Sequence, residues 1–423
     1  MAQLSDDCFA FGGSLKPAAE ALALIENASV PIVNIEIVPL SMASGRILAQ
    51  SLTSPFNVPP HDNAAVDGYA VYYDDLNKNN ETRLTISGRA TAGHPFKGDT
   101  PRGSALQVFT GAAILPDKNG NTVDTIFMQE DCRLEDDHIV FPPGIKIGSN
   151  KRHAGEDIRA GSIILKAGQK LRPQDVGLAA AAGFSTIPVY TRLQVAVFST
   201  GDELFEPGVK LPSGGIYDSN RYTICSLLEN LGCTVNDLGI LCDNETSVKK
   251  AIATAASHYD IIITSGGVST GAEDHVKAAL EKLGTLHFWR LAIRPGRPIA
   301  FGQINQVPFI GLPGNPVAVM VTFLLFARPL LLRLGGCHKT EPQYYQVTSA
   351  FEYKKKHGRR EWLRARIAHS SSGELIAEKF SRDGAGVLSS IVFADGLIEV
   401  EESVTLIKQG DIVKFLSFNE ISR

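Results

Sequence analysis

The feature that most constrains the fold is a regular alternation of strand-like and helix-like segments between residues 191 and 335. Short apolar runs such as LQVAVFS and DIIITS are typical of buried strands. The segments between them carry apolar residues at helical spacing, such as Ile224, Leu227, Leu228 and Leu231. Repeated strand–helix–strand units predict a doubly wound, mostly parallel α/β sheet with helices on both faces.

The rest of the chain has a different character. Helices are expected over residues 18–28, 41–50 and 173–183, the last with Pro173 at its start and Gly183 at its end. Residues 54–148 carry many Pro, Gly, Asp and Asn residues between short β-prone runs, which indicates a small β-rich domain. Residues 340–423 return to a β-type sequence.

Composition and charge exclude several classes of protein. Apolar residues make up 44% of the 423 residues, which is enough for a globular core. The net charge of −4 provides no general basic field, so no nucleic-acid partner is expected. The six cysteines form no C-x-x-C pair, and we expect reduced thiols in a cytoplasmic protein.

No membrane segment is expected. The most apolar stretch, residues 317–334, is interrupted by Thr322, Arg328 and Pro329 and falls short of roughly 18 unbroken apolar residues. It is interpreted as a buried helix that ends near Pro329. The N-terminus lacks a basic start followed by an apolar run, so no signal peptide is expected.

Polar and glycine-rich loops follow the expected strands of the α/β segment. Glu203, Asp243, residues 265–274 and residues 311–316 each come directly after one of these strands. Ligands in doubly wound sheets bind at the carboxyl ends of the strands, so these loops should gather at one edge. This convergence is the strongest indication of a functional site that the residues themselves give.

Two of these loops have the features of an anion site. Ser265, Gly266 and Gly267 form one, and GLPGNP, with Pro313, Gly314 and Asn315, forms the other. Glycine lets the backbone approach a ligand, and free N–H groups at a helix start favour an anion. Asn315 is placed as N-cap with Pro316 at the first helical position. Ordinary strand–helix turns are the alternative, but two such loops on one edge favour a phosphate or oxyanion site.

Charged residues of both signs belong to the same edge. Glu203, Asp243 and Asp274 would repel one another in a shared pocket unless a cation such as Mg²⁺ lay between them. The alternative for each carboxylate is a helix cap or a solvated loop charge. Arg294 and Arg297 flank a Pro-Gly turn and, with Arg290, could bind an oxyanion or form a surface cluster.

Several common catalytic motifs are absent from the sequence, namely the P-loop, G-x-G-x-x-G after a strand, and H-E-x-x-H. Two further motifs, NAAVDGYAV with Asp67 and VFTGAAILP with Thr110, lie outside the α/β segment. Taken alone, each indicates only a turn.

Together these motifs resemble those of the molybdopterin molybdenumtransferase family, which inserts molybdenum during molybdenum-cofactor synthesis and includes the C-terminal domain of gephyrin. The matching motifs run in order along nearly the whole chain: AAVDGYAV, FTGAAILP, RHAGEDIRAGSIILKAG, STGDEL, DSN, SGGVSTGAED, LAIRPGRP and GLPGNPVA. Each motif is weak alone, whereas their order is highly specific.

The resemblance implies four domains and an elongated homodimer, with the site between the α/β domain of one chain and the other chain. Residues 17–53 and 149–190 would form a discontinuous mixed α/β domain, and residues 54–148 a β-rich domain. Residues 191–335 would form the molybdopterin-binding α/β domain, and residues 340–423 a C-terminal domain resembling a β-barrel.

The resemblance also implies a reaction. Adenylylated molybdopterin and molybdate would be the substrates, with the former supplied by a separate molybdopterin adenylyltransferase. A step that depends on a divalent cation, Mg²⁺, would hydrolyse the adenylate to AMP, and molybdenum would be inserted between the two dithiolene sulfurs.

The family's functional residues can be placed on this sequence by motif. Its acids fall on Asp67, Glu203, Asp243 and Asp274, and its threonine falls on Thr110. Its basic residues fall on Arg290, Arg294, Arg297 and, in the C-terminal domain, Arg364. We expect Glu203, Asp243 and Asp274 to hold the metal, and the two glycine-rich loops to bind the nucleotide.

The chain departs from the family in three places. The family's lysines in the turn at residues 294–297 are arginines here, which keeps the charge but changes the hydrogen-bonding geometry. Val66 stands where the family has Met, and Ala385 stands where some members have a serine near the oxyanion. Three alternatives remain. The protein could insert tungstate, it could have a related pterin-binding or nucleotide-hydrolysing activity, or it could be a non-catalytic pterin-binding scaffold.

Overall fold

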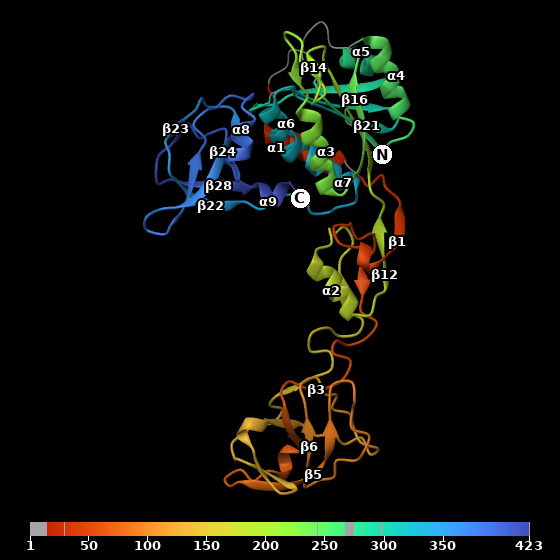
Figure 1. The fold of residues 1–423 in the computed structure, drawn as a ribbon, viewed down its shortest axis with the longest axis vertical. Helices are drawn as coiled ribbons and strands as arrows, with labels where there is room; N and C mark the ends of the chain where they lie inside the picture. Colours follow the sequence, from red (N-terminus) through yellow and green to blue (C-terminus); the bar gives the residue numbers. More distant parts are fainter. Residues whose placement is uncertain (1–14, 29, 243, 267–274, 297, 423) are drawn as a thin grey trace.

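The protein is elongated in the computed structural model, which describes residues 15–28, 30–242, 244–266, 275–296 and 298–422. Figure 1 shows the α/β unit and the C-terminal β unit side by side at one end of the molecule. The β-rich unit lies at the opposite end, and a small mixed unit with β1, β12 and α2 lies between the two ends.

The α/β unit is built on a six-stranded sheet in the order β16-β13-β17-β21-β20-β18. The first four strands are parallel, and β20 and β18 are antiparallel. The expected mostly parallel sheet is therefore confirmed. The strands are β13 (Gln194–Thr200), β16 (Thr234–Leu241), β17 (Ile261–Ser265), β18 (Gly284–Arg290), β20 (Pro298–Ile304) and β21 (Val307–Leu312).

Helices cover both faces of this sheet, because its strands are apolar on both sides. One core includes side chains of α1 (Ala18–Ala28), α3 (Asn220–Leu231) and the helix that follows β21. A second core includes α4 (Glu245–Ala255) and α5 (His275–Leu283), packed on Ala196, Phe198 and Ile262. The expected helix over residues 18–28 is confirmed.

The long apolar helix continues past the position where the sequence predicts its end. It comprises α6 (Pro316–Thr322), a π-helical stretch η5 (Phe323–Ala327) and α7 (Arg328–Leu334). The predicted end near Pro329 is wrong, because the wider π turn precedes the proline and lets the helix continue without its N–H. The 19-residue helix is long and apolar enough to cross a membrane, but 78% of its most apolar window is buried in the molecule.

The mixed unit is held together by two strand pairs. β1 (Ile35–Pro39) pairs with β12 (Thr186–Tyr190), and β2 (Leu52–Thr53) pairs with β11 (Ile163–Leu165). These pairs join the segments that precede and follow the β-rich unit. Helix α2 (Pro173–Ala181) begins at Pro173, as the sequence predicts.

The helix predicted over residues 41–50 is wrong. Only a 3₁₀ turn, η2 (Leu40–Met42), forms there, and Ile47 and Leu48 make bridges to Lys170 and Val189. Gly45 has a φ of +77°, which an α-helix does not accommodate, so the chain turns at this residue.

The β-rich unit contains a six-stranded sheet in the order β7-β4-β6-β5-β9-β8. A short pair, β3 (Asn63–Ala64) with β10 (Lys151–Arg152), lies where the chain enters and leaves this unit. The sheet strands are β4 (Gly68–Val71), β5 (Thr82–Ala90), β6 (Ser104–Val108), β7 (Thr125–Met128), β8 (Arg133–Glu135) and β9 (His138–Phe141), with 3₁₀ turns η3 (Tyr73–Asp75) and η4 (Gln129–Asp131).

The C-terminal unit contains a closed barrel of five strands, which confirms the expected barrel-like domain. The order is β24-β25-β22-β28-β26, and β26 pairs back onto β24. The strands are β22 (Tyr345–Ser349), β24 (Arg360–His369), β25 (Leu375–Lys379), β26 (Gly396–Val400) and β28 (Ile412–Ser417). The pair β23 (Tyr353–Lys354) with β27 (Leu406–Ile407) and the helices α8 (Ser389–Phe393) and α9 (Phe418–Ile421) complete the unit.

The α/β unit and the barrel are joined by hydrogen bonds as well as by packing. A two-residue strand from the α/β segment, β19 (Ile293–Arg294), pairs with β24 of the barrel. Trp362 of β24 lies edge-on to Phe326, with ring centroids 6.3 Å apart. The turn after Arg294 is therefore held between the sheet and the barrel.

Two glycine positions give a matched test of this fold. A Cβ on Gly68 of β4 would lie 1.7 Å from the carbonyl oxygen of Phe127, so Gly68→Ala must push β4 and β7 apart. We expect a loss of more than about 2 kcal/mol of stability in the β-rich unit. A Cβ on Gly177 of α2 meets no atom, and Gly177→Ala should stabilise its helix by about 0.5–1 kcal/mol. Thermal unfolding and limited proteolysis of the two variants measure the predicted loss and the predicted gain of stability. A Gly68→Ala protein as stable as the unmodified protein would contradict the strand register.

Candidate active site

Three strand ends of the α/β sheet meet at the predicted edge. The N–H of Gly266, after β17, donates to the carbonyl oxygen of Leu312 at the end of β21, at 3.2 Å. Gly266 has a φ of +83°, and a Cβ there would lie 3.1 Å from the carbonyl oxygen of Thr200. A larger residue would be strained and crowded at this crossing, so glycine is needed where the β13, β17 and β21 loops converge.

Asn220, at the start of α3, ties two of these loops together. Its Nδ2 donates to Ser265 Oγ at 2.9 Å and to the carbonyl oxygen of Gly314 at 2.7 Å. Ser265 Oγ also donates to the carbonyl oxygen of Pro313 at 3.3 Å. Asn220 is not among the site residues predicted from the sequence. Its only signal was the DSN segment before a helix, which also fits an ordinary helix cap.

Only some of the backbone N–H groups at the start of α6 are free to bind a ligand. Asn315 occupies the N-cap position and Pro316 the first helical position, as predicted, but the Asn315 side chain makes no capping bond. The N–H of Val317 donates at 3.0 Å to the carbonyl oxygen of Ala385, from the loop after the barrel strand β25. Gly314 and Asn315 are exposed, so their backbone can be reached from solvent.

Glu203 lies in an exposed turn just beyond the end of β13. The turn leads into a small flap formed by β14 (Leu204–Phe205) and β15 (Ile216–Tyr217), and the carbonyl oxygen of Glu203 accepts from the N–H of Ile216 at 2.7 Å. Gly201, with a φ of +147°, allows the Glu203 carboxylate to fold back over it.

A buried arginine anchors this flap. Arg221 of α3 is 3% exposed and ion-pairs with Glu206 on the flap, with Asp237 on β16 and with Asp218 beside its own helix. The distances are 2.6 Å to Glu206 and 3.1 Å to Asp218. Because one guanidinium is shared by three carboxylates, the flap that carries Glu203 is fixed to the sheet.

Arg294 lies where the α/β segment meets the barrel. It lies on β19, its side chain is 47% exposed, and its Nη1 is 3.4 Å from Tyr353 Oη and 3.6 Å from Glu361 Oε2. The turn after it packs on α6, because a Cβ on Gly296 would lie 2.9 Å from Thr322 Cγ2 and 3.2 Å from Ala318 Cβ. The arginine turn and the GLPGNP loop are thus neighbours through α6.

Arg364, the predicted basic residue of the barrel, is buried. It is 4% exposed, its Nε donates to Ser390 Oγ at 3.1 Å, and its Nη2 donates to the carbonyl oxygen of Arg382 at 2.8 Å. Burial lowers the pKa of Arg364, and the nearby Arg294 contributes to the same shift. These bonds hold the loop that carries Ala385 against α6. The guanidinium of Arg364 therefore stabilises the loop.

Asp67 and Thr110 form a pair on the β-rich unit. Asp67 Oδ1 accepts from the Thr110 N–H at 2.7 Å and from Thr110 Oγ1 at 2.8 Å. These bonds lower the pKa of Asp67, with the backbone N–H as the larger cause. In Figure 1 the β-rich unit lies at the far end of the molecule from the α/β unit, so one chain does not bring this pair to the sheet edge.

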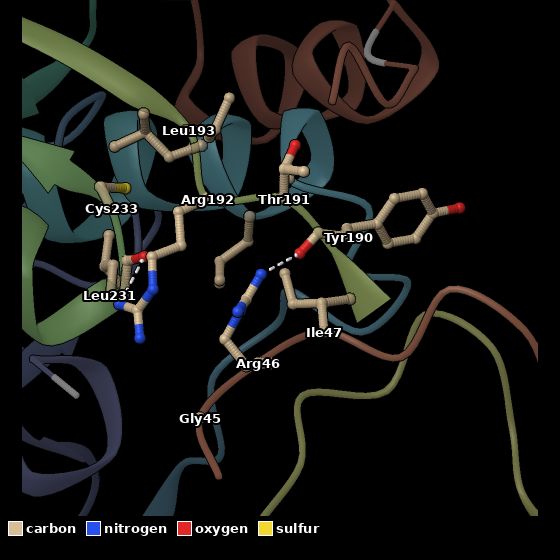
Figure 2. A pocket seen from close by; sticks show the side chains of 13 residues that line it. Gly45, Arg46, Ile47, Tyr190, Thr191, Arg192, Leu193, Leu231 and Cys233 are labelled. Carbon is tan, nitrogen blue, oxygen red and sulfur yellow. Dashed lines mark hydrogen bonds between the residues drawn. The ribbon is translucent and has the colours of Figure 1, made fainter. Parts of the chain in front are cut away.

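The structure also contains a small cavity, of about 40 Å³, between the mixed and α/β units. Figure 2 shows Arg46 and Arg192 beside it, with Arg46 bonded to the carbonyl oxygen of Tyr190. Leu193 and Cys233 precede β13 and β16, so the cavity lies at the amino ends of the strands, opposite the edge where the sequence predicts a ligand. Burial raises the pKa of the Cys233 thiol to about 12, which makes it a poor nucleophile.

Four of the predicted site residues lie outside the described part of the chain: Asp243, Gly267, Asp274 and Arg297. Arg290 is the last residue of β18. Within the described ranges no three His, Cys, Asp or Glu residues form a group able to hold a metal. The predicted residues that converge in the described part of the chain are Ser265, Gly266, Pro313, Gly314 and Asn315, joined by Asn220. Arg294 is connected to them only through the packing of its turn on α6.

The Asp67–Thr110 pair makes a prediction about charge. Thr110→Val removes the hydroxyl bond but keeps the backbone one, so the pKa of Asp67 should rise part of the way towards its ordinary value of 3.8. As its pKa rises, Asp67 should become protonated at a higher pH than in the unmodified protein. NMR titration of labelled aspartate carboxyls measures this pKa directly. Thr122→Val in the same unit should leave it unchanged, and an unaltered Asp67 titration in Thr110→Val would contradict the assigned bond.

Comparisons with known proteins agree with this architecture. Three family descriptions match in order: "MoeA N-terminal region (domain I and II)" at residues 16–183, "Probable molybdopterin binding domain" at residues 196–333, and "MoeA C-terminal region (domain IV)" at residues 346–418.

Individual relatives extend the match over most of the chain. The molybdopterin molybdenumtransferase of Haemophilus influenzae is 39% identical over 388 residues, which cover 91% of this chain and 94% of that protein. Gephyrin of Dictyostelium discoideum is 31% identical over 368 residues, covering 76% of this chain and 50% of gephyrin. The crystal structure of the molybdopterin biosynthesis MoeA protein from Pyrococcus horikoshii OT3 superposes with a TM-score of 0.80 at 29% identity, covering 96% and 100% of the two chains. The chain therefore belongs to the molybdopterin molybdenumtransferase family, and the resemblance carried by its ordered motifs is confirmed.

Proposed function

We propose that this protein is a transferase that inserts molybdenum from molybdate into adenylylated molybdopterin, with hydrolysis of the adenylate to AMP. The observation that carries the proposal is the convergence of the Gly266 and Gly314 loops under one side chain, Asn220, at the carboxyl ends of the sheet strands. Membership of the molybdopterin molybdenumtransferase family supports the choice of substrate.

The adenylate would bind along the two glycine-rich loops. Gly266 and Gly314 allow the backbone to approach phosphate oxygens, and the exposed Asn315 backbone lies at the start of a helix, where an anion is favoured. Asn220 and Ser265 use their side chains to fix the spacing of these loops. Their role is to position the backbone donors, so that little reorganisation is needed when the phosphates bind.

The acidic residues of this edge suit a hard cation. Glu203 is exposed in the turn after β13, so its carboxylate can be reached from solvent. Together with Asp243 and Asp274 it would supply only oxygen ligands, the set that Mg²⁺ prefers. When bound, Mg²⁺ would neutralise charge on the phosphate during cleavage.

The oxyanion would bind near Arg294. This guanidinium is half-exposed and lies on a turn packed against α6, close to the GLPGNP loop. Arg290 and Arg297 would add to the same field, because they flank this turn in the sequence. Arg364 would act indirectly, by holding the Ala385 loop in place.

A second copy of the chain would complete the site. Asp67 and Thr110 belong to the β-rich unit, which lies at the opposite end of the molecule from the α/β unit, so they would reach a substrate at the sheet edge from a partner subunit. A homodimer in which each β-rich unit faces the partner's α/β unit would bring the Asp67–Thr110 pair to the adenylate.

The role of Asn220 can be tested by its removal. Asn220→Ala should lower kcat/KM for adenylylated molybdopterin roughly 10-fold or more, because two hydrogen bonds that hold the loops are lost. AMP release is measured with purified protein, Mg²⁺ and molybdate, and again with tungstate in place of molybdate. Asn230→Ala, at the exposed far end of the same helix, is the matched control and should behave like the unmodified protein. Unchanged kcat/KM in Asn220→Ala would count against this site.

The shared site can be tested by complementation. Asp67→Ala and Asp274→Ala should each abolish AMP release while the proteins remain folded. When the two variants are produced together, half of the dimers should be mixed, and each mixed dimer should contain one intact site of two. About a quarter of the original activity should then return. If the mixture stays as inactive as the single variants, all residues of the site come from one chain.

A further inference from the structure

The barrel places a buried carboxylate directly beside the proposed oxyanion residue. Arg294 and Glu361 face each other in the β19–β24 register, with Arg294 Nη1 3.6 Å from Glu361 Oε2. The Glu361 side chain is 5% exposed, whereas that of Arg294 is 47% exposed. The carboxylate is therefore fixed inside the barrel, while the guanidinium still presents donors to solvent.

A tyrosine holds this carboxylate in place. Tyr353 Oη donates to Glu361 Oε2 at 2.6 Å and lies 3.4 Å from Arg294 Nη1. Burial and the adjacent Glu361 raise the pKa of Tyr353, so the hydroxyl stays protonated and can only support the negative charge. Because Tyr353 is itself buried, Glu361 has little room to turn away from Arg294.

The other charged side chains near Arg294 and Glu361 have partners of their own. Lys379 lies over the Tyr353 ring, 5.4 Å from its centroid, and is paired with Asp383 at 2.6 Å. Arg364 is bonded within the barrel and contributes a second positive charge near Arg294. The buried carboxylate of Glu361 thus forms an ion pair with Arg294, and the 3.6 Å contact is loose enough to leave Arg294 able to bind an external anion.

We infer that Glu361, fixed by Tyr353, is the counter-charge of the oxyanion site and determines its selectivity between doubly and singly charged oxyanions. The inference rests on the proposed oxyanion role of Arg294. Repulsion from a fixed carboxylate acts twice as strongly on a dianion as on a monoanion. Glu361 therefore limits the preference for dianions that the surrounding arginines would otherwise impose.

The test compares two tetrahedral oxyanions of different charge, tungstate and perrhenate. Their dissociation constants are measured on the purified full-length protein by titration calorimetry at one fixed ionic strength. In Glu361→Gln the ratio of tungstate to perrhenate affinity should rise about three-fold or more, because the shape of the site is kept and one negative charge is lost. Glu378→Gln, which removes a more exposed barrel carboxylate paired with Arg366, should leave the ratio unchanged.

Two further variants distinguish a wrong role for Glu361 from a wrong role for Arg294. Tyr353→Phe frees the Glu361 carboxylate to pair fully with Arg294, so the ratio should fall, and this variant serves if Glu361→Gln does not fold. In Arg294→Gln, tungstate binding should weaken. If tungstate binding is unaffected by Arg294→Gln, the oxyanion role of Arg294 in the proposed function is wrong. If Arg294→Gln weakens binding but neither Glu361→Gln nor Tyr353→Phe changes the ratio, only the counter-charge inference is overturned.

Discussion

The site depends on one side-chain amide that fixes the spacing of two glycine-rich loops. Asn220 donates both of its Nδ2 hydrogens, one to Ser265 Oγ and one to the carbonyl oxygen of Gly314. No other side-chain type has the same reach with two donors and no charge, and a charged group at this position would change the electrostatics of an anion site. The two loops follow different strands, and the bonds from the Gly266 N–H to the carbonyl oxygen of Leu312 and from Ser265 Oγ to that of Pro313 support the same spacing.

The barrel also helps to position the loops of the candidate site. Strand β19 adds to its edge, the carbonyl oxygen of Ala385 caps the N–H of Val317, and Trp362 packs on Phe326 of the long helix. These contacts fix the arginine turn on one side of α6 and the GLPGNP loop at its start. The C-terminal unit therefore shapes a candidate site whose glycine-rich loops belong to another unit.

Much of the fold follows from the sequence because the strand and helix periods are clear between residues 191 and 335. The carboxyl-end rule then places Ser265, Gly266, Gly314 and Asn315 together, as the structure does. The long helix was harder to predict, because a proline normally ends a helix and the π turn at residues 323–327 has no local signature.

Other features depend on contacts that no local pattern encodes. Asn220 is distinguishable from a helix cap only once the Gly314 loop lies above it, and Arg364 looks like a surface arginine until the barrel closes around it. The separation of the β-rich unit from the α/β unit depends on the mixed unit, which lies between them.

Hydrogen–deuterium exchange in the presence of AMP and Mg²⁺ tests the central claim most directly, because it locates the nucleotide on the chain without requiring turnover. Binding along the Asn220-linked loops predicts slower exchange of backbone amides around residues 265–266, 312–317 and 220–223. Slower exchange confined to residues 45–47, 190–193 and 231–233, which line the cavity at the opposite edge of the sheet, would contradict the account.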